Sequence, residues 1–129
     1  MNKEEYNKLS RQILEASLSV HKEMGPGMLE AVYESCLLQE LTMRNIKVKS
    51  QVFLPLFYKG VELKKDFRID ILVESEIIIE LKAVDVILPV HEAQIISYLK
   101  LADKKLGFLI NFNVPLIKDG FRRFINGYL

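Results

Sequence analysis

Hydrophobic positions in the first third of the chain recur at helical spacing. Between Asn2 and Glu23 apolar residues return among charged ones as they do on one face of a helix, and Gly25-Pro26-Gly27 ends that pattern. From Met28 to Asn45 apolar residues recur every three or four positions. This spacing is typical of an amphipathic helix. We therefore expect two helices joined by a Gly-Pro-Gly turn.

The period changes to two in the middle of the chain. Val48 to Tyr58 and Val61 to Val73 are rich in β-branched and aromatic residues, and Lys59-Gly60 between them is a turn signal. Ile77 to Lys82 is short and almost entirely apolar, and residues 74–76 are polar enough to form a tight loop. The pattern predicts a meander of three antiparallel strands.

The last third combines a helix with a buried strand. Pro89 precedes a helical pattern from His91 to Ala102, and Leu106 to Phe112 reads as a buried strand. In the tail, Phe121 to Ile125 fits either a strand or a helical turn, and we expect a strand. The predicted order is α-α-β-β-β-α-β, an α/β fold of the α+β type, in one domain over residues 1–129.

Composition limits the kinds of site and the cellular compartment that we expect for this chain. The chain has 129 residues and one cysteine, Cys36, which excludes an internal disulfide and a multi-cysteine zinc site. Cys36 falls on the apolar arc of the second predicted helix, so we expect a buried thiol. The first residues lack the apolar region of a secretion signal, and no uncharged run reaches membrane-helix length. We expect a cytoplasmic protein without a membrane partner.

Charge is unevenly distributed although the net charge is only +1. Residues 1–43 hold 4 basic and 7 acidic side chains, 44–68 hold 7 and 2, 70–92 hold 1 and 6, and 100–123 hold 6 and 2. An acidic centre between two basic segments suits a metal site beside a phosphate-binding track. Solvated faces that happen to cluster would give the same counts.

Candidate chemistry gathers where the second and third predicted strands meet. If 74–76 is a symmetric turn, residues equally distant from Ser75 face each other, so Asp70 lies opposite Glu80. Like charges in that position destabilise the sheet unless a cation offsets them. The same register places Arg68 opposite Lys82 on the same face. A slip of one residue would move one acid to the other face.

Each of these residues also has a plainer interpretation. Glu80 and Lys82 occupy a strand otherwise suited to burial, where a structural ion pair is the alternative to a functional site. Glu30 falls within the apolar arc of the second helix, facing the site or stabilising the helix N-terminus. Gln94 and Tyr98 share one helix face, and they either reach the site or hydrogen-bond across the domain.

Several motifs resemble one known family. Gly27-x-x-Glu30-x-x-Tyr33 matches the signature of the GxxExxY proteins, which resemble the PD-(D/E)XK nuclease superfamily. Asp70 followed by Glu80-Leu81-Lys82 looks like the D…ExK core, and Gln94 to Leu99 looks like the QxxxY helix of several nuclease branches. Ile69 stands where the superfamily pattern has proline. The resemblance extends from the first helix to Phe112.

The resemblance implies a restriction-endonuclease-like core, with a central mixed sheet flanked by helices. It implies that Asp70 and Glu80 bind Mg²⁺ or Mn²⁺, with Glu30 assisting. Lys82 would position or deprotonate the attacking water, or stabilise the transition state, and Gln94 would orient water or a phosphate oxygen. The reaction implied is hydrolysis of a phosphodiester bond.

The resemblance also implies supporting residues and partners. Tyr33, Tyr98 and Arg68 take supporting positions, although core packing is the simpler role for both tyrosines. The expected partner is nucleic acid, DNA in preference to RNA, with a homodimer or a larger assembly supplying specificity.

Two alternatives to a nuclease stay open at this stage. One is a non-catalytic domain with the nuclease fold that binds or regulates within a larger nucleic-acid-processing or defence assembly. The other is a purely structural ion-pair cluster, which predicts no response to divalent metal.

Overall fold

A computed structural model describes residues 1–64 and 67–129 completely, and residues 65 and 66 by backbone only. Helix α1 spans Lys3–Met24, and helix α2 spans Glu30–Met43. The Asn2 side chain caps α1 by accepting a hydrogen bond from the Glu5 N–H, and the Glu5 side chain accepts one from the Asn2 N–H. Both helices predicted for this part of the chain are confirmed, with ends within two residues of the predicted ones.

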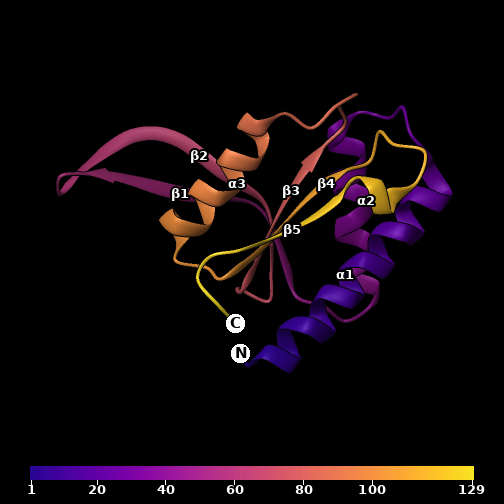
Figure 1. Cartoon of the computed structure of the whole chain (residues 1–129), viewed down its shortest axis with the longest axis horizontal. Coiled ribbons are helices and arrows are strands. Elements are labelled where there is room, and N and C mark those ends of the chain that lie inside the picture. The colour runs from indigo at the N-terminus through magenta and orange to yellow at the C-terminus, as the bar shows by residue number, and fades with distance from the viewer.

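The remaining elements form one five-stranded mixed sheet (Figure 1). Strands β1, β2 and β3 form the predicted antiparallel meander, and β4 runs parallel to β3 after helix α3. A 3₁₀ turn, η1, precedes β5, which confirms a strand in the tail and pairs antiparallel with β4. The bounds are Val48–Tyr58 for β1, Val61–Val73 for β2, Ile77–Lys82 for β3, Pro89–Ala102 for α3, Leu106–Asn111 for β4, Ile117–Asp119 for η1 and Phe121–Ile125 for β5. The predicted order and mixed sheet are confirmed.

The sheet separates two apolar layers. Alternate residues of β3, Ile77 and Ile79, pack with the buried faces of α1 and α2. Ile78 between them packs on the other side with Ile95 and Leu99 of α3. Glu80 has the same parity as Ile78, so the pleat directs it toward the α3 side.

Helix α1 is the longest helix, with 22 residues. Its buried residues, among them Leu9, Ile13 and Ala16, lie on one face, as its sequence period predicts. Most of the remaining surface of the helix is polar or charged, apart from the exposed Leu18. In the part of the chain that the structure describes, no helix is both long and apolar enough to cross a membrane.

The β1–β2 hairpin extends well beyond the rest of the sheet. β2 pairs with β3 only from Ile71 to Val73, whereas its pairing with β1 continues to the turn at Lys59-Gly60. Residues 52–69 therefore form a two-stranded hairpin arm, which projects past α3 on the left of Figure 1. Leu54 and Ile69 anchor the base of the arm against α3.

Tyr33 holds the Gly-Pro-Gly turn against the core. Its hydroxyl donates a hydrogen bond to the Gly25 carbonyl at 2.5 Å and accepts one from the Met28 N–H at 3.0 Å. Its ring stacks on Phe112 with 4.7 Å between ring centroids. Tyr33 therefore fixes the start of α2, the helix that carries Glu30.

We expect Tyr33→Phe to lower the free energy of unfolding by roughly 1–3 kcal/mol, because it leaves partly buried backbone groups of the turn without their partner. Urea unfolding followed by circular dichroism measures the loss. Tyr128→Phe is the matched control, because Tyr128 is 85% exposed and should tolerate the change. Equal stability of the two variants would contradict this role.

Candidate active site

Asp70 and Glu80 meet where the ladder between β2 and β3 stops. The register from Val73↔Ile77 to Ile71↔Ile79 is the predicted one, but the paired residues end there. The carboxylate of Asp70 instead accepts a hydrogen bond from the Leu81 N–H, with 2.8 Å between Oδ2 and N. The backbone ladder thus ends one pair before Asp70 and Glu80, where the Asp70 side chain takes the backbone donor of β3. The predicted proximity of the two acids is nevertheless present.

Glu80 is an acid in a nearly closed environment. The residue is 3% exposed, and its Oε1 atom has no hydrogen-bond partner. Burial, then the charge of Asp70 and a side-chain hydrogen bond with it, raise the pKa of Glu80 to about 10, although Lys82 acts in the opposite direction. A proton on Glu80 therefore relieves the repulsion between the two carboxyl groups. An added cation would relieve the same repulsion.

Glu34 and Gln51 complete the polar surroundings of Asp70, and neither was among the predicted site residues. Gln51 Nε2 donates to Glu34 Oε1 at 2.8 Å and to Asp70 Oδ1 at 3.3 Å. Burial, then the charge of Asp70, raise the pKa of Glu34. The spacing of Glu34 four residues after Glu30 was a usable signal, because such residues share a helix face. Gln51 gave no signal in the sequence.

Glu30 and Lys82 lie near the acid pair without a direct contact to it among the hydrogen bonds and ion pairs of the described residues. Glu30 shares a helix face with the buried residues Tyr33 and Leu37, as its predicted place in the apolar arc requires, but it is exposed because it begins the helix. The first turn of the helix lies at the domain edge, where the carboxylate reaches water. Partial burial of that carboxylate, then the charge of Asp70, raise the pKa of Glu30, and Lys82 lowers it. The pKa of Glu30 therefore depends on the charges of both Asp70 and Lys82.

Helix α3 brings Gln94 and Tyr98 toward the same acids. Gln94 Nε2 donates a hydrogen bond to the Tyr98 hydroxyl at 3.2 Å. Burial raises the pKa of Tyr98, the Gln94 hydrogen bond lowers it, and the charges of Glu80 and Asp70 raise it. Tyr98 is buried with its ring edge-on to Phe67, so it packs in the core while its hydroxyl holds Gln94.

Arg68 lies on β2 two residues before Asp70. It is exposed on the hairpin arm and pairs across the ladder with Phe53 of β1. The predicted opposition of Arg68 and Lys82 is wrong, because β2 leaves β3 at Asp70 before reaching that position. Within the described residues no group of three or more His, Cys, Asp or Glu side chains is arranged to hold a metal ion. The direct contact is between two acids, Asp70 and Glu80.

Comparison with known proteins identifies the same architecture. Residues 7–124 match a family model described as the PD-(D/E)XK nuclease superfamily. The crystal structure of SSO0001 superposes with a TM-score of 0.51 at 24% sequence identity, over 77% of this chain and 50% of that chain. The present chain thus matches about half the length of SSO0001, and the likeness concerns the fold. No curated protein matches the sequence.

We expect Glu80→Gln to stabilise the metal-free protein at pH 8 by roughly 1–3 kcal/mol, because the neutral amide can be buried without taking up a proton, whereas burial raises the pKa of Glu80. The native state keeps the Glu80 proton, whereas the unfolded chain releases it above its ordinary pKa of 4.5. The free energy of unfolding therefore falls as pH rises from about 4.5 toward 10. The gain in stability of Glu80→Gln over the wild type should therefore vanish near pH 4, where the unfolded chain also keeps this proton.

Thermal unfolding in EDTA at pH 4 and pH 8 measures this difference. Glu62→Gln, an exposed change at the far end of the hairpin arm, is the matched control. If the stability gain of Glu80→Gln is the same at both pH values, or absent at both, the raised pKa of Glu80 is contradicted.

Proposed function

We propose that this chain, which belongs to the PD-(D/E)XK nuclease superfamily, is a nuclease that uses Mg²⁺ or Mn²⁺ to hydrolyse phosphodiester bonds in nucleic acid. The observation that carries the proposal is the buried contact between Asp70 and Glu80, with an unpartnered carboxylate oxygen. Two adjacent buried carboxylates repel each other when both are ionised. Their oxygen atoms are the ligands that a hard divalent cation prefers. DNA is the proposed substrate in preference to RNA.

The donor set fits a hard divalent cation. Asp70 and Glu80 would hold the ion, with Glu30 assisting from the first turn of α2. Mg²⁺ is commonly bound by one or two carboxylates together with water and substrate phosphates, so a site with two direct protein acids is sufficient. When bound, the ion lowers the pKa of water and neutralises charge that develops on the phosphate.

The chain's own side chains supply the remaining functions. The Leu81 N–H and the Gln51 amide fix the orientation of the Asp70 carboxylate through hydrogen bonds. Lys82 follows Glu80 by two residues on the same face of β3, which suits it to position the attacking water or to stabilise negative charge in the transition state. Gln94, held by Tyr98, is suited to orient water or a phosphate oxygen.

Two finer assignments belong to the same proposal. Gly27, Glu30 and Tyr33 favour the GxxExxY family within the superfamily, and the anchored Gly-Pro-Gly turn gives the signature a physical role. A single cysteine fits a reducing compartment, so we place the protein in the cytoplasm.

A non-catalytic nuclease-fold module that binds nucleic acid or regulates a larger assembly is the second candidate. The observation in its favour is that only two acids make direct contact, with no third metal-type ligand joining them among the described residues. Such a module would bind nucleic acid without cleaving it and would need no divalent ion. The metal titration below separates the two.

We expect the protein to bind one Mn²⁺ per chain in calorimetric titration, and Asp70→Asn to lose that binding, because the substitution removes a charged ligand. Asp103→Asn is the matched control. Asp103 is exposed at the C-cap of α3 in the left-handed conformation, which asparagine adopts well. The nuclease proposal would be contradicted by equal Mn²⁺ binding in the wild type and both variants.

We expect Lys82→Ala to reduce cleavage of DNA by about 100-fold or more while leaving Mn²⁺ binding in place, because the lysine acts on water and phosphate and does not ligate the ion. Lys104→Ala, two residues after the end of α3, is the control. Single-turnover assays on single-stranded and duplex oligonucleotides in Mn²⁺ give the rates. Equal rates for the two lysine variants would exclude a catalytic role for Lys82.

A further inference from the structure

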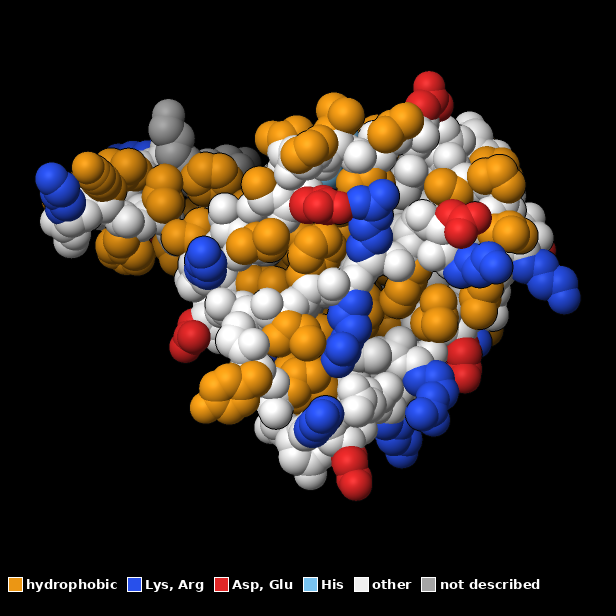
Figure 2. All heavy atoms as spheres, in the orientation of Figure 1, with side chains coloured by type: hydrophobic (Ala, Val, Ile, Leu, Met, Phe, Trp, Pro, Cys, Tyr) orange, Lys and Arg blue, Asp and Glu red, His pale blue; other side chains and the backbone are white. Residues whose placement is uncertain are grey.

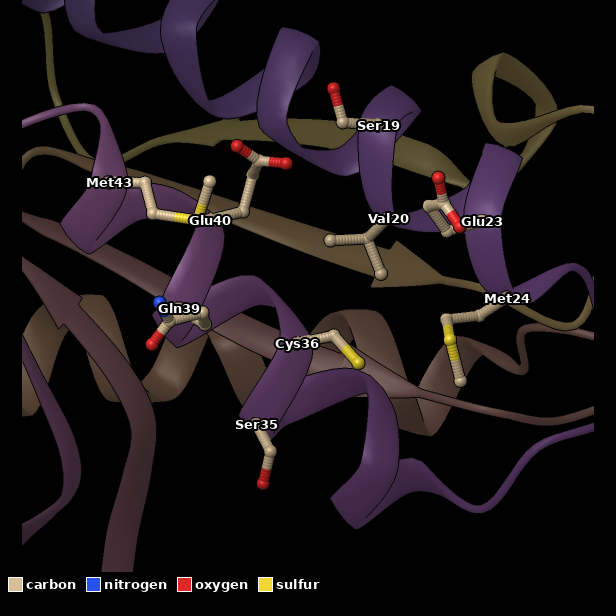
Figure 3. A pocket seen from close by; sticks show the side chains of 9 residues that line it. All are labelled: Ser19, Val20, Glu23, Met24, Ser35, Cys36, Gln39, Glu40 and Met43. Atoms are coloured by element: carbon tan, nitrogen blue, oxygen red, sulfur yellow. The ribbon is translucent and has the colours of Figure 1, made fainter.

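Away from the acids, α1 and α2 enclose a groove of about 340 Å³ (Figure 3). Val20 and Met24 from α1 and Cys36 and Met43 from α2 give it a mostly apolar lining. Met43 is 66% exposed, and Cys36, predicted as a buried thiol, is partly exposed here. Continuous exposed apolar surface of this kind is typical of a binding site.

Acidic side chains form part of the groove rim. Glu23 of α1 and Glu40 of α2 both line it, and Glu40 forms an ion pair with Arg44 at 3.4 Å. Residues 1–43, which form both helices, contain 7 acidic and 4 basic side chains. The chemistry of the groove therefore selects an apolar segment with positive charge.

The tip of the hairpin arm has that complementary chemistry. Phe57 is 60% exposed and Val61 is 61% exposed, and Tyr58 lies opposite Val61 across the ladder. Figure 2 shows apolar side chains along the arm with a basic group at its end. Lys59 at the turn lies 5.5 Å from the centroid of the Tyr58 ring. A two-stranded hairpin is marginal in water by itself, so covering this tip would stabilise it.

We propose that the tip of the hairpin arm of one copy of this chain binds in the α1–α2 groove of a second copy. The apolar tip matches the apolar lining, and Lys59 matches the acidic rim at Glu23. The arm cannot fill the groove of its own copy, because Figure 1 places the arm and the two helices at opposite ends of the molecule. A twofold axis between two copies pairs each arm with the other copy's groove, which closes the dimer.

Nucleic acid is a less suitable partner for the tip of the hairpin arm than the groove of a second copy. Residues 44–68 carry 7 basic and 2 acidic side chains, but the tip itself, residues 57–64, has only two lysines and one glutamate, which is little charge for a phosphate backbone. The side chains that dominate the tip, Phe57, Val61 and Leu63, are apolar and exposed. Charge-poor apolar surface is typical of contacts between proteins.

Cysteine cross-linking tests the pairing directly, because Cys36 is the only cysteine and lines the groove. Val61→Cys places a second thiol on the tip. Under mild oxidation, this variant should form a cross-linked dimer, and Val61→Cys combined with Cys36→Ser should not. Ser75→Cys, at the exposed turn between β2 and β3, is the control and should form no such dimer.

Mass measurement by light scattering provides the second readout. We expect the wild type to elute at twice 14.9 kDa, and Met43→Lys to shift the dimer toward monomer by at least 10-fold in dissociation constant, because it places a cation against Lys59. Leu101→Lys, a matched change at an exposed apolar site on α3, should leave the dimer intact. Circular dichroism confirms that both variants fold.

Three outcomes would overturn the inference. A wild type that stays monomeric at millimolar concentration has no such interface. Cross-linking that persists without Cys36 places two arm tips against each other and leaves the groove empty. A monomer whose nucleic-acid binding is lost in Phe57→Ser assigns the arm to substrate. None of these results depends on cleavage activity, so a failure of the nuclease proposal is recognised separately.

Discussion

The contact between Asp70 and Glu80 is the constraint on which the site depends. A carboxylate that is 3% exposed and faces another carboxylate is stable only with a shared proton or a bound cation. Burial and the charge of Asp70 raise the pKa of Glu80 and so favour the shared proton when no cation is bound. Hydrogen bonds from Leu81 and Gln51 hold Asp70 in place, so the two acids cannot simply move apart.

The same contact shapes the sheet around it. Because Asp70 uses its side chain to bond the Leu81 N–H, the regular ladder between β2 and β3 ends at Ile71↔Ile79. Before that point β2 pairs only with β1, which leaves the two strands to continue as the hairpin arm. The end of the ladder thus brings the two acids together and lets β1 and β2 continue as the hairpin arm.

The sequence predicted the fold more fully than the site. Alternation and the turn at 74–76 were enough to give the bounds of β1, β2 and β3 and the register to Ile71, because a slip would have placed apolar residues in water. The sequence did not show that the backbone ladder ends before Asp70, because a side chain that accepts the Leu81 N–H does not alter the hydrophobic period. The same limit applies to Gln51, which has a positive φ of 50° inside a strand. The helical angle of Glu30 gave its face but not its exposure, which follows from its place in the first turn of α2.

The central claim is that Asp70 and Glu80 form a cation site, and crystals soaked in Mn²⁺ test it most directly. Anomalous diffraction locates the ion without relying on a substrate or on activity. The account predicts one strong peak in contact with carboxylate oxygens of both Asp70 and Glu80, and no such peak in crystals of Asp70→Asn. A peak bound elsewhere, or an intact hydrogen bond between the two acids at saturating Mn²⁺, would contradict it.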